Sequence, residues 1–394
     1  MVQIVLFGVF LFAVLEAAMY LLPAKEFQRM YMYKMFGPGT FNPYSLNPGA
    51  KTIHATDEFS VTMKVNDQGL RDVPHTYQKE EGIYRILTVG DSFTLGHGVE
   101  LEEIYMKQLE KMLNQRRWDK VKKVEVVNGG GASGYSQDTQ YLFVKNEGLK
   151  YHPDMVIVGL FAYNDVVEIE VSSNWEKQKD GLPEKISTEH YYLVSRKYTP
   201  VRKFLYKVIS YSRLLTKVND IVATFRYRFV IPPDRKKELD PTQKQDYDGF
   251  GFFREKMSLS TQEGFEKWKR VIQGLKKLCD SNGVELVVML IPMDMQIYFE
   301  EGYKTLSPQL QSTITPEMMK ADWSQKRLTG FMKNQSIPYV DLLPVFRERS
   351  NEYKGTEVYF NYDKHWRPLG HRIAAESLFN FVSPRIDEKN KGMK

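Results

Sequence analysis

Short apolar runs alternate with amphipathic stretches of helical length from about residue 84 to the end of the chain. The apolar runs cover 84–89, 124–127, 155–160, 284–291 and 339–343. The helical stretches cover 101–115, 137–147, 262–282 and 321–334, with a last helix after Pro368. Buried strands separated by helices are typical of a parallel sheet covered on both faces. The pattern predicts a three-layer α/β/α, flavodoxin-like domain with a five-stranded parallel sheet.

The first residues differ from the rest of the chain. Nearly every residue from Val2 to Leu22 is apolar. About 20 such residues form roughly 30 Å of helix, which is enough to cross the hydrocarbon core of a bilayer. Gln3 and Glu16 interrupt the run, so a cleaved signal peptide or a buried amphipathic helix is the alternative. We expect a single transmembrane helix that anchors the chain through residues 1–24.

The charges around this helix bear on which side of the membrane the main domain lies. Lys25, Arg29 and Lys34 follow the apolar run, and no Lys or Arg precedes it. The positive-inside rule alone therefore places the main domain in the cytoplasm. Long domains that follow an anchor translocate largely regardless of this rule. We expect a single-pass membrane protein with an extracytoplasmic main domain, against the local charge cue.

Two further segments lack the strand and helix alternation. Residues 25–83 are rich in turn formers and contain a strand-like alternation at 59–65, which predicts a linker with a β-rich lead-in. The main domain then occupies residues 84–394. Within it, residues 171–260 show no regular alternation and contain Pro232-Pro233, so we expect an inserted cap or subdomain there.

Basic residues are concentrated inside this insertion. The net charge of the 394-residue chain is +6, yet residues 196–228 alone hold nine Lys or Arg and one acid, Asp220. Local basicity argues against a nucleic-acid-binding protein and fits either a solvated helical face or a face that meets lipid headgroups or an anionic polymer. The single cysteine, Cys279, excludes an intrachain disulfide and a cysteine-based metal cluster.

Candidate chemistry lies at the ends of the predicted strands. Ser92 directly follows the strand that ends in Gly90-Asp91. A serine hydroxyl needs a base within hydrogen-bond reach, and that base needs an acceptor that fixes its tautomer. Asp363 and His365, two residues apart before the last helix, supply both roles. The sequence therefore predicts Ser92 as nucleophile, His365 as base and then acid, and Asp363 as the group that orients it.

Acyl transfer through this serine also needs donors for the developing oxyanion. The backbone amides of Ser92 and Gly134 and the side-chain amide of Asn164 are the candidates. Gly134 belongs to a glycine-rich run after a strand, where Gly131 is a rival donor. Parallel strands present their carboxyl ends at one edge of the sheet, so these positions converge there. Such a site requires no metal or organic cofactor.

These residues resemble the SGNH or GDSL hydrolases, which are named for Ser, Gly, Asn and His in four ordered blocks. Here the blocks look like Ser92, Gly134, Asn164 and His365. The chain departs from the family pattern at Ala162, where the third block usually has glycine, and in its shorter Asp-x-His spacing. Neither departure removes a catalytic atom. The resemblance covers about 84–165 and 284–382 and leaves out the insertion.

The resemblance implies a membrane-anchored serine esterase or O-acyltransferase that acts on acylated carbohydrate or lipid. Its Asp-x-His-Trp form is similar to members that acetylate or deacetylate exopolysaccharides, which favours sugar O-acyl groups. The alternative is a non-catalytic scaffold on the membrane that binds glycan or a partner. A phosphate or flavin binder fits less well, because the turn at Ser92 lacks a glycine-rich cradle.

Overall fold

A single parallel sheet forms the centre of the molecule. The computed structural model describes residues 1–37, 39, 40, 42, 44–131, 135–163, 165–171, 175–186, 200–225, 229, 230 and 250–392. The strands of the sheet are β5 (Ile83–Gly90), β6 (Lys123–Gly130), β7 (Met155–Phe161), β10 (Glu285–Ile291) and β11 (Tyr339–Asp341). Their order is β6-β5-β7-β10-β11, and all of these pairings are parallel. This is the flavodoxin-like order, in which the chain reverses direction across the sheet between β5 and β7. The predicted fold class is confirmed.

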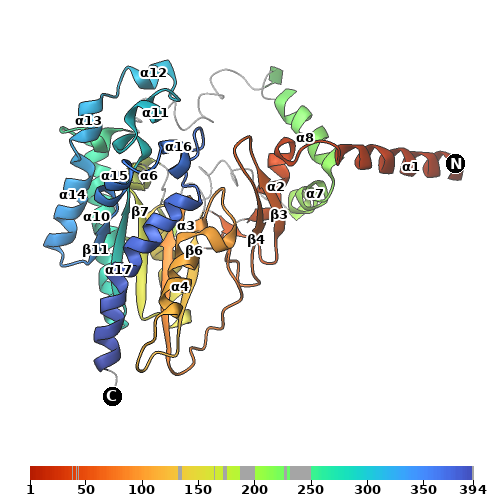
Figure 1. Cartoon of the computed structure of the whole chain (residues 1–394). Coiled ribbons are helices and arrows are strands. Elements are labelled where there is room, and N and C mark those ends of the chain that lie inside the picture. Colours follow the sequence, from red (N-terminus) through yellow and green to blue (C-terminus); the bar gives the residue numbers. More distant parts are fainter. Residues whose placement is uncertain are drawn as a thin grey trace.

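Helices cover both faces of the sheet (Figure 1). One face packs against α4 (Tyr105–Gln115), α15 (Leu343–Arg349) and α17 (Pro368–Gly392). The other packs against α5 (Gln137–Asn146), α6 (Asp165–Val171), α10 (Leu259–Ser281) and α14 (Trp323–Asn334).

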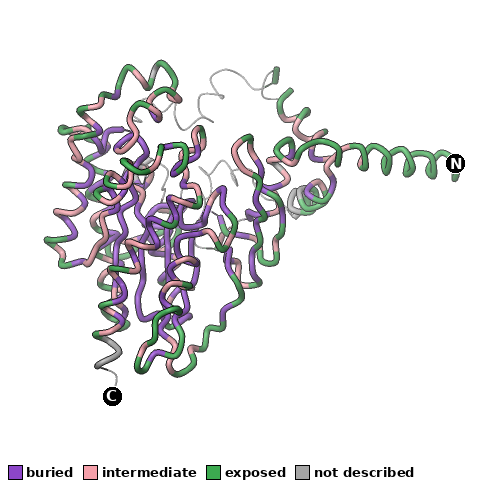
Figure 2. The backbone as a smooth tube through the Cα atoms, viewed as in Figure 1, coloured by how far each residue is buried: buried purple, intermediate pink, exposed green. Residues whose placement is uncertain are grey.

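The strands supply both cores by simple alternation, because successive side chains point to opposite faces. In β5, Leu87 and Val89 contribute to the core under α5 and α10, and Ile86 contributes to the core under α4 and α17. Nearly the whole sheet is buried (Figure 2). A sheet buried on both faces explains why the strands read as unbroken apolar runs.

Shorter elements connect the strands and helices. They are α3 (Ser92–Leu95), η2 (Leu101–Glu103), η3 (Gly148–Tyr151), η6 (Gly251–Phe253), η7 (Asp294–Gln296), α11 (Phe299–Tyr303), α12 (Pro308–Gln311), α13 (Pro316–Lys320) and α16 (Gly355–Val358). The most important for function is α3, which directly follows β5.

The N-terminal segment has two parts. Helix α1 (Val2–Met19) has no buried residue and projects away from the body (Figures 1 and 2). It is long and apolar enough to cross a membrane, a test that a signal sequence also passes.

The lead-in follows α1 and packs on the main domain. It contains η1 (Ala24–Phe27), α2 (Gln28–Met35), β1 (Phe36–Gly37), β2 (Ser45–Leu46), β3 (Lys51–Ala55) and β4 (Ser60–Lys64). The strand expected at 59–65 is present as β4, which pairs with β3 in an antiparallel hairpin. Met35, Tyr44 and Met63 of the lead-in share a core with Leu95 and Tyr135 of the main domain.

The described part of the insertion includes two pieces that pack in different places, besides η6 and the start of α10. Strands β8 (Trp175–Lys179) and β9 (Leu182–Ile186) form a hairpin against α5 and α10. Helices α7 (Pro200–Ser210) and α8 (Arg213–Phe225) pack instead against α2. Of the basic residues predicted in this region, Arg196, Lys197, Arg226 and Arg228 lie outside the described residues.

Candidate active site

Ser92 is positioned by the strand before it and the short helix that it begins. The Asp91 side chain caps α3 by accepting a 3.0 Å hydrogen bond from the Phe93 amide. Glycine is required at position 90, because a Cβ there would lie 2.0 Å from Thr94 Oγ1 and 3.1 Å from the Gly159 carbonyl oxygen. This local geometry places the Ser92 hydroxyl at the carboxyl end of β5, and the residue is 8% exposed.

Asp363 and His365 lie on a tight loop closed by an antiparallel bridge between Tyr359 and Trp366. Lys364 between them has a φ of 69°, a left-handed conformation that costs about 1–2 kcal/mol for a residue with a side chain. Its ammonium group pairs with Asp294 at 3.1 Å, which helps to hold the turn. The loop directs both the carboxylate and the imidazole toward Ser92.

The three side chains form one hydrogen-bonded chain. The Ser92 hydroxyl lies 2.6 Å from His365 Nε2, and His365 Nδ1 lies 2.5 Å from Asp363 Oδ1. A carboxylate on Nδ1 fixes the proton on that nitrogen and leaves Nε2 free to accept the proton of the serine. The structure therefore brings together the three residues predicted from the sequence, at the point where the strand order reverses.

A second histidine, which the sequence reasoning missed, binds the other oxygen of the same carboxylate. His97 Nε2 lies 3.1 Å from Asp363 Oδ2, and the His97 ring is centred 4.4 Å from the His365 ring. His97 lies between Gly96 and Gly98, both with a φ of 81°, so the chain turns sharply on each side of it. The available signal was a histidine flanked by two glycines just after the serine motif.

Glu58 in the lead-in holds the loop that carries Asp363. Its carboxylate accepts hydrogen bonds from three successive backbone amides: Asn361 at 2.5 Å, Tyr362 at 3.0 Å and Asp363 at 2.9 Å. Charge-assisted bonds of this kind are about twice as strong as neutral ones. Glu58 is therefore a positioning residue for the acid–base loop, supplied from about 300 residues away.

Arg71, also in the lead-in, holds the loop that carries His97. Its guanidinium donates to the carbonyls of Leu95 at 2.9 Å, Gly96, and Val99 at 2.5 Å, and the residue is 1% exposed. These carbonyls lie at the end of α3 and in the turn after it, so Arg71 satisfies acceptors that the helix end leaves free.

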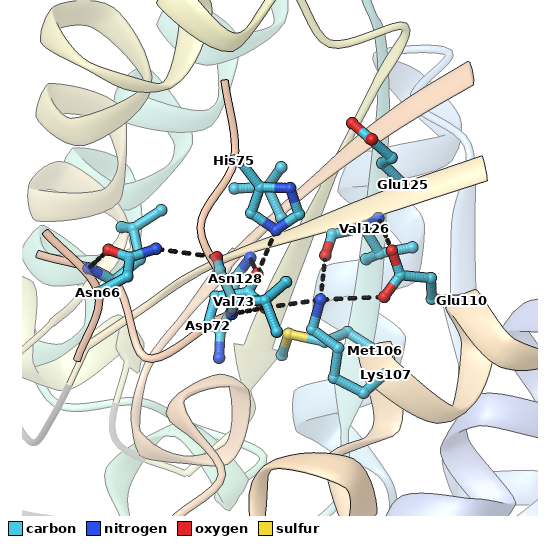
Figure 3. A network of polar contacts seen from close by, with 12 residues as sticks. Asn66, Asp72, Val73, His75, Met106, Lys107, Glu110, Glu125, Val126 and Asn128 are labelled. Atoms are coloured by element: carbon cyan, nitrogen blue, oxygen red, sulfur yellow. Dashed lines mark hydrogen bonds and ion pairs between the residues drawn. The ribbon is translucent and has the colours of Figure 1, made fainter. Parts of the chain in front are cut away.

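A buried polar network fixes the lead-in to the main domain next to Arg71 (Figure 3). Asp72 pairs with Lys107 of α4 at 2.6 Å and with His75 at 3.0 Å, and it accepts a 2.8 Å hydrogen bond from the Asn128 amide of β6. Lys107 also donates to the Val126 carbonyl at 2.8 Å. The lead-in is thus bonded to both a helix and a strand of the main domain.

The two acids nearest the nucleophile and the base have opposite pKa shifts. Complete burial raises the pKa of Asp91 to about 6. Burial also acts to raise the pKa of Asp363, but hydrogen bonds from His365 and His97 outweigh it and hold that pKa well below its usual range. Asp363 is therefore ionised at any ordinary pH, as an acceptor for His365 must be.

The other histidines near the site have lowered pKa values. Burial lowers the pKa of His97, and the nearby His365 lowers it further. Burial lowers the pKa of His54 and of His371 to about 3 each. His371, the weaker candidate in the sequence, is buried and accepts a 3.3 Å hydrogen bond from the Tyr105 amide.

The oxyanion donors are less completely described. Gly134 and Asn164 lie outside the described residues. The rival candidate, Gly131, uses its amide in a 2.9 Å hydrogen bond to the Gly90 carbonyl. The turn after β7 is held by Asp165, whose carboxylate accepts from Gln137 at 2.6 Å and from the Phe161 amide at 2.9 Å.

His97, Asp363 and His365 also offer ligand atoms within 4.8 Å of one another, a spacing that could hold a metal ion. These same atoms already hydrogen-bond to one another, and His365 to Ser92 as well. The arrangement fits proton transfer along a chain of side chains.

Comparison with protein-family models supports the resemblance to SGNH hydrolases. Residues 247–393, less than half of the chain, match the family model of the ALGX SGNH hydrolase-like domain, acetyltransferase AlgX. The match includes Asp363 and His365 and does not reach Ser92. It confirms the resemblance to SGNH hydrolases for this part of the chain. A comparison of the sequence with curated proteins finds no match.

Among solved structures, the chain is similar to a catalytic mutant of Axe2, an acetylxylan esterase from Geobacillus stearothermophilus. The TM-score is 0.38 at 12% identity, over 76% of this chain and 94% of that chain. It is also similar to the lipase/acylhydrolase from Enterococcus faecalis, with a TM-score of 0.36 at 13% identity, over 77% of this chain and 96% of that chain.

Proposed function

We propose that the protein is a membrane-anchored serine esterase or O-acyltransferase that acts on O-acyl groups, chiefly acetyl groups, of a carbohydrate. The observation that carries this proposal is the continuous hydrogen-bonded chain from Ser92 through His365 to Asp363. The family match, to an SGNH hydrolase-like domain of an acetyltransferase, supports the same reaction class.

The geometry supports the following sequence of steps. His365 Nε2 takes the proton of Ser92 as the hydroxyl oxygen attacks the ester carbonyl, and Asp363 stabilises the imidazolium that forms. The tetrahedral intermediate collapses, the His365 proton passes to the departing alcohol, and an acyl-serine remains. Water or a second hydroxyl then gives its proton to His365 as it attacks the acyl-serine. The second tetrahedral intermediate collapses, and His365 returns the proton to the departing Ser92 oxygen.

Hydrolysis and transfer differ only in the acceptor for the acyl group. Acceptance by water makes an esterase, and acceptance by a sugar hydroxyl makes an O-acyltransferase. The Asp363-Lys364-His365-Trp366 form and the acetyltransferase in the matched family favour acetylated sugar as substrate. The membrane anchor is α1, which by length and composition can span a bilayer.

The test is covalent labelling by a fluorescent serine-reactive phosphonate, together with turnover of p-nitrophenyl acetate and of acetylated xylan. We expect the full chain in detergent to be labelled once and to release acetate. Ser92→Ala should abolish both signals. Ser281→Ala, at an exposed serine near the end of α10, is the matched control and should change neither.

Equal labelling of the wild type and Ser92→Ala would overturn the assignment of the nucleophile. A folded wild-type protein that is neither labelled nor active on either ester would favour the glycan-binding scaffold instead. Transfer of the acetyl group from a donor ester to an unacetylated xylo-oligosaccharide, faster than release of acetate into water, would identify the transferase.

A further inference from the structure

Helix α8 has its polar and apolar faces reversed relative to a helix on the surface of a soluble protein. Thr216 is buried, as is Ser212 directly before the helix, and the Asn219 side chain donates a 3.0 Å hydrogen bond to the Tyr33 hydroxyl of α2. The outer face carries apolar residues at helical spacing: Val218, Ile221, Val222 and Phe225, each at least 49% exposed. A helix of a soluble domain turns its apolar face inward, so this outer face needs an apolar environment.

Helix α7 adds a second exposed apolar face. Val201, Phe204, Leu205 and Val208 recur at helical spacing, and each is at least 41% exposed. Tyr211, between the two helices, is 69% exposed. Contiguous exposed apolar surface of this kind marks a site of interaction with protein or membrane.

The position of α8 relative to α1 identifies the environment. Glu16 of α1 accepts hydrogen bonds from the Ser212 hydroxyl at 2.7 Å, the Arg213 amide at 2.9 Å and the Leu214 amide at 3.0 Å. Arg213 in turn donates to the carbonyl of Leu22 at 3.1 Å. The one acid in the apolar run thus caps the start of α8, and α7 and α8 lie at the base of α1 (Figure 1).

The depth of this junction agrees with a helix in the membrane interface. Glu16 lies three residues before the end of α1, which is about 5 Å along a helix. Interfacial amphipathic helices bury their apolar faces roughly 5–10 Å into the boundary between headgroups and acyl chains. A bilayer spanned by α1 therefore reaches the level of α8.

Cationic side chains surround the same region. A cavity of about 400 Å³ beside Arg213 is lined by Lys34 and Lys51 together with Phe27, Met30 and Ile53. Lys217 of α8 pairs with Glu26 at 2.8 Å. A cavity lined by both cations and apolar side chains matches an anionic lipid, whose phosphate would meet the cations and whose acyl chains would meet the apolar side chains.

We propose that α7 and α8 form a second contact with the bilayer, lying in its interface with their apolar faces among the acyl chains of anionic phospholipid. This inference rests on the membrane anchoring in the proposed function. It means that the domain is held against the lipid surface in a fixed orientation, because α8 is bonded both to α1 and to the lead-in that supports the active site.

The test uses single cysteines that carry an environment-sensitive NBD fluorophore, in the full chain reconstituted into vesicles with phosphatidylglycerol. The native Cys279 is buried, and burial raises the pKa of its thiol to about 12, so it will not be labelled. We expect NBD at Val222→Cys and at Phe204→Cys to be blue-shifted and quenched at least twofold by doxyl-labelled phospholipid. Lys320→Cys, exposed on α13, should be unaffected.

A Val9→Cys label on α1 separates the premise from the inference. Quenching at Val9 without quenching at Val222 and Phe204 would overturn the second contact and leave the anchor intact. Absence of quenching at Val9 as well would overturn both. Labels at Val222 that are shielded from water but not quenched by doxyl lipid, and that become exposed on dilution of the protein in the vesicles, would show pairing with a second copy instead.

The cationic cavity is tested in the same vesicles. We expect doxyl-phosphatidylglycerol to quench the Val222→Cys label more than doxyl-phosphatidylcholine does. The Lys34→Gln/Lys51→Gln variant should abolish that preference while the quenching itself persists. If both lipids quench the Val222→Cys label equally in the protein that retains Lys34 and Lys51, a role for anionic headgroups is contradicted.

Discussion

The two loops that meet in the candidate active site are positioned in different ways. Ser92 itself is fixed by its own neighbours: β5 before it, the Asp91 cap, and Gly90 packed against Thr94. Arg71 of the lead-in holds only the turn that follows, at the end of α3. The acid–base loop contains a left-handed Lys364 and depends on Glu58, which accepts from three of its amides.

The Ser92 turn is held by contacts between neighbouring residues, whereas the acid–base loop is held by a residue far away in the sequence. A strand that runs into a capped helix needs only a few adjacent residues, so it leaves a recognisable motif. A loop held by the carboxylate of a distant residue has no motif in its own sequence that reveals this contact. The nucleophile should therefore tolerate the loss of Glu58, which the acid–base pair does not.

The largest expected effect is on the attachment of the lead-in itself. Asp72→Asn removes the charge that the buried Lys107 pairs with, and breaking a buried pair destabilises a protein by about 3–5 kcal/mol. Since Lys107 keeps its 3.0 Å contact with Glu110, we expect about 3 kcal/mol, at the lower end. Denaturant titration of the full chain in detergent measures this loss.

Lys123→Gln is the matched control, because its contact with Glu125 is exposed on the lysine side. It should cost less than about 1 kcal/mol. Equal stability of Asp72→Asn and the wild type would show that the lead-in is held by apolar packing alone.

The sequence predicts the features that depend on local contacts and misses those that depend on long-range contacts. Periodicity predicts the strands and the fold class, which the structure confirms. Short motifs predict Ser92, Asp363 and His365 as the catalytic residues, and the structure brings these three side chains into one hydrogen-bonded chain. The supports Glu58 and Arg71 were missed, because their partners are backbone groups of other segments. Every residue type has a backbone carbonyl, and all but proline have an amide hydrogen, so the sequence does not show which of these groups Glu58 and Arg71 bind.

The next prediction is that the acids of the two loops change the stability of the protein in opposite directions as the pH changes. The pKa of Asp91 is raised from 3.8 to about 6, so its contribution to stability is complete below about pH 4 and is lost as the pH rises through 6. The pKa of Asp363 is lowered, so its contribution is present above about pH 4 and is lost as the pH falls.

Asp91→Asn should therefore gain stability relative to the wild type between pH 5 and 8, by up to about 3 kcal/mol for a shift of about two pKa units. Asp363→Asn should lose stability relative to the wild type above about pH 4, and the difference should begin to shrink as the pH falls below 4. Unfolding curves of both variants from pH 3 to 8 measure these trends. Parallel trends in the two variants would refute the opposite shifts.

A smaller effect isolates the long-range support. Glu58→Gln keeps the size of the side chain and removes the charge that three amides share. Displacement of a catalytic group by about 1 Å can cost about 10²-fold in rate, which corresponds to about 2.7 kcal/mol. We expect kcat for acetyl ester turnover to fall by about 10²-fold with KM nearly constant.

Asp57→Asn, the exposed neighbour that pairs with Lys25, is the control and should retain full activity. A purely structural role for Glu58 would lower the unfolding midpoint and leave kcat of the folded protein unchanged. That result would remove the contrast between the two loops.

The smallest effect concerns His97, which joins the two loops. It follows α3 on the Ser92 loop, yet its Nε2 donates to Asp363 on the other loop. His97→Phe keeps an aromatic ring against His54 and Phe59, whose rings lie 4.6 and 5.4 Å away, and removes only the donor. The loss of one charge-assisted hydrogen bond at a partly exposed carboxylate should lower kcat about tenfold, or about 1.4 kcal/mol.

His97→Gln, which restores a donor, should recover part of that loss in the same assay. If the glutamine variant is no more active than the phenylalanine variant, ring packing rather than the hydrogen bond links the nucleophile loop to the acid–base loop.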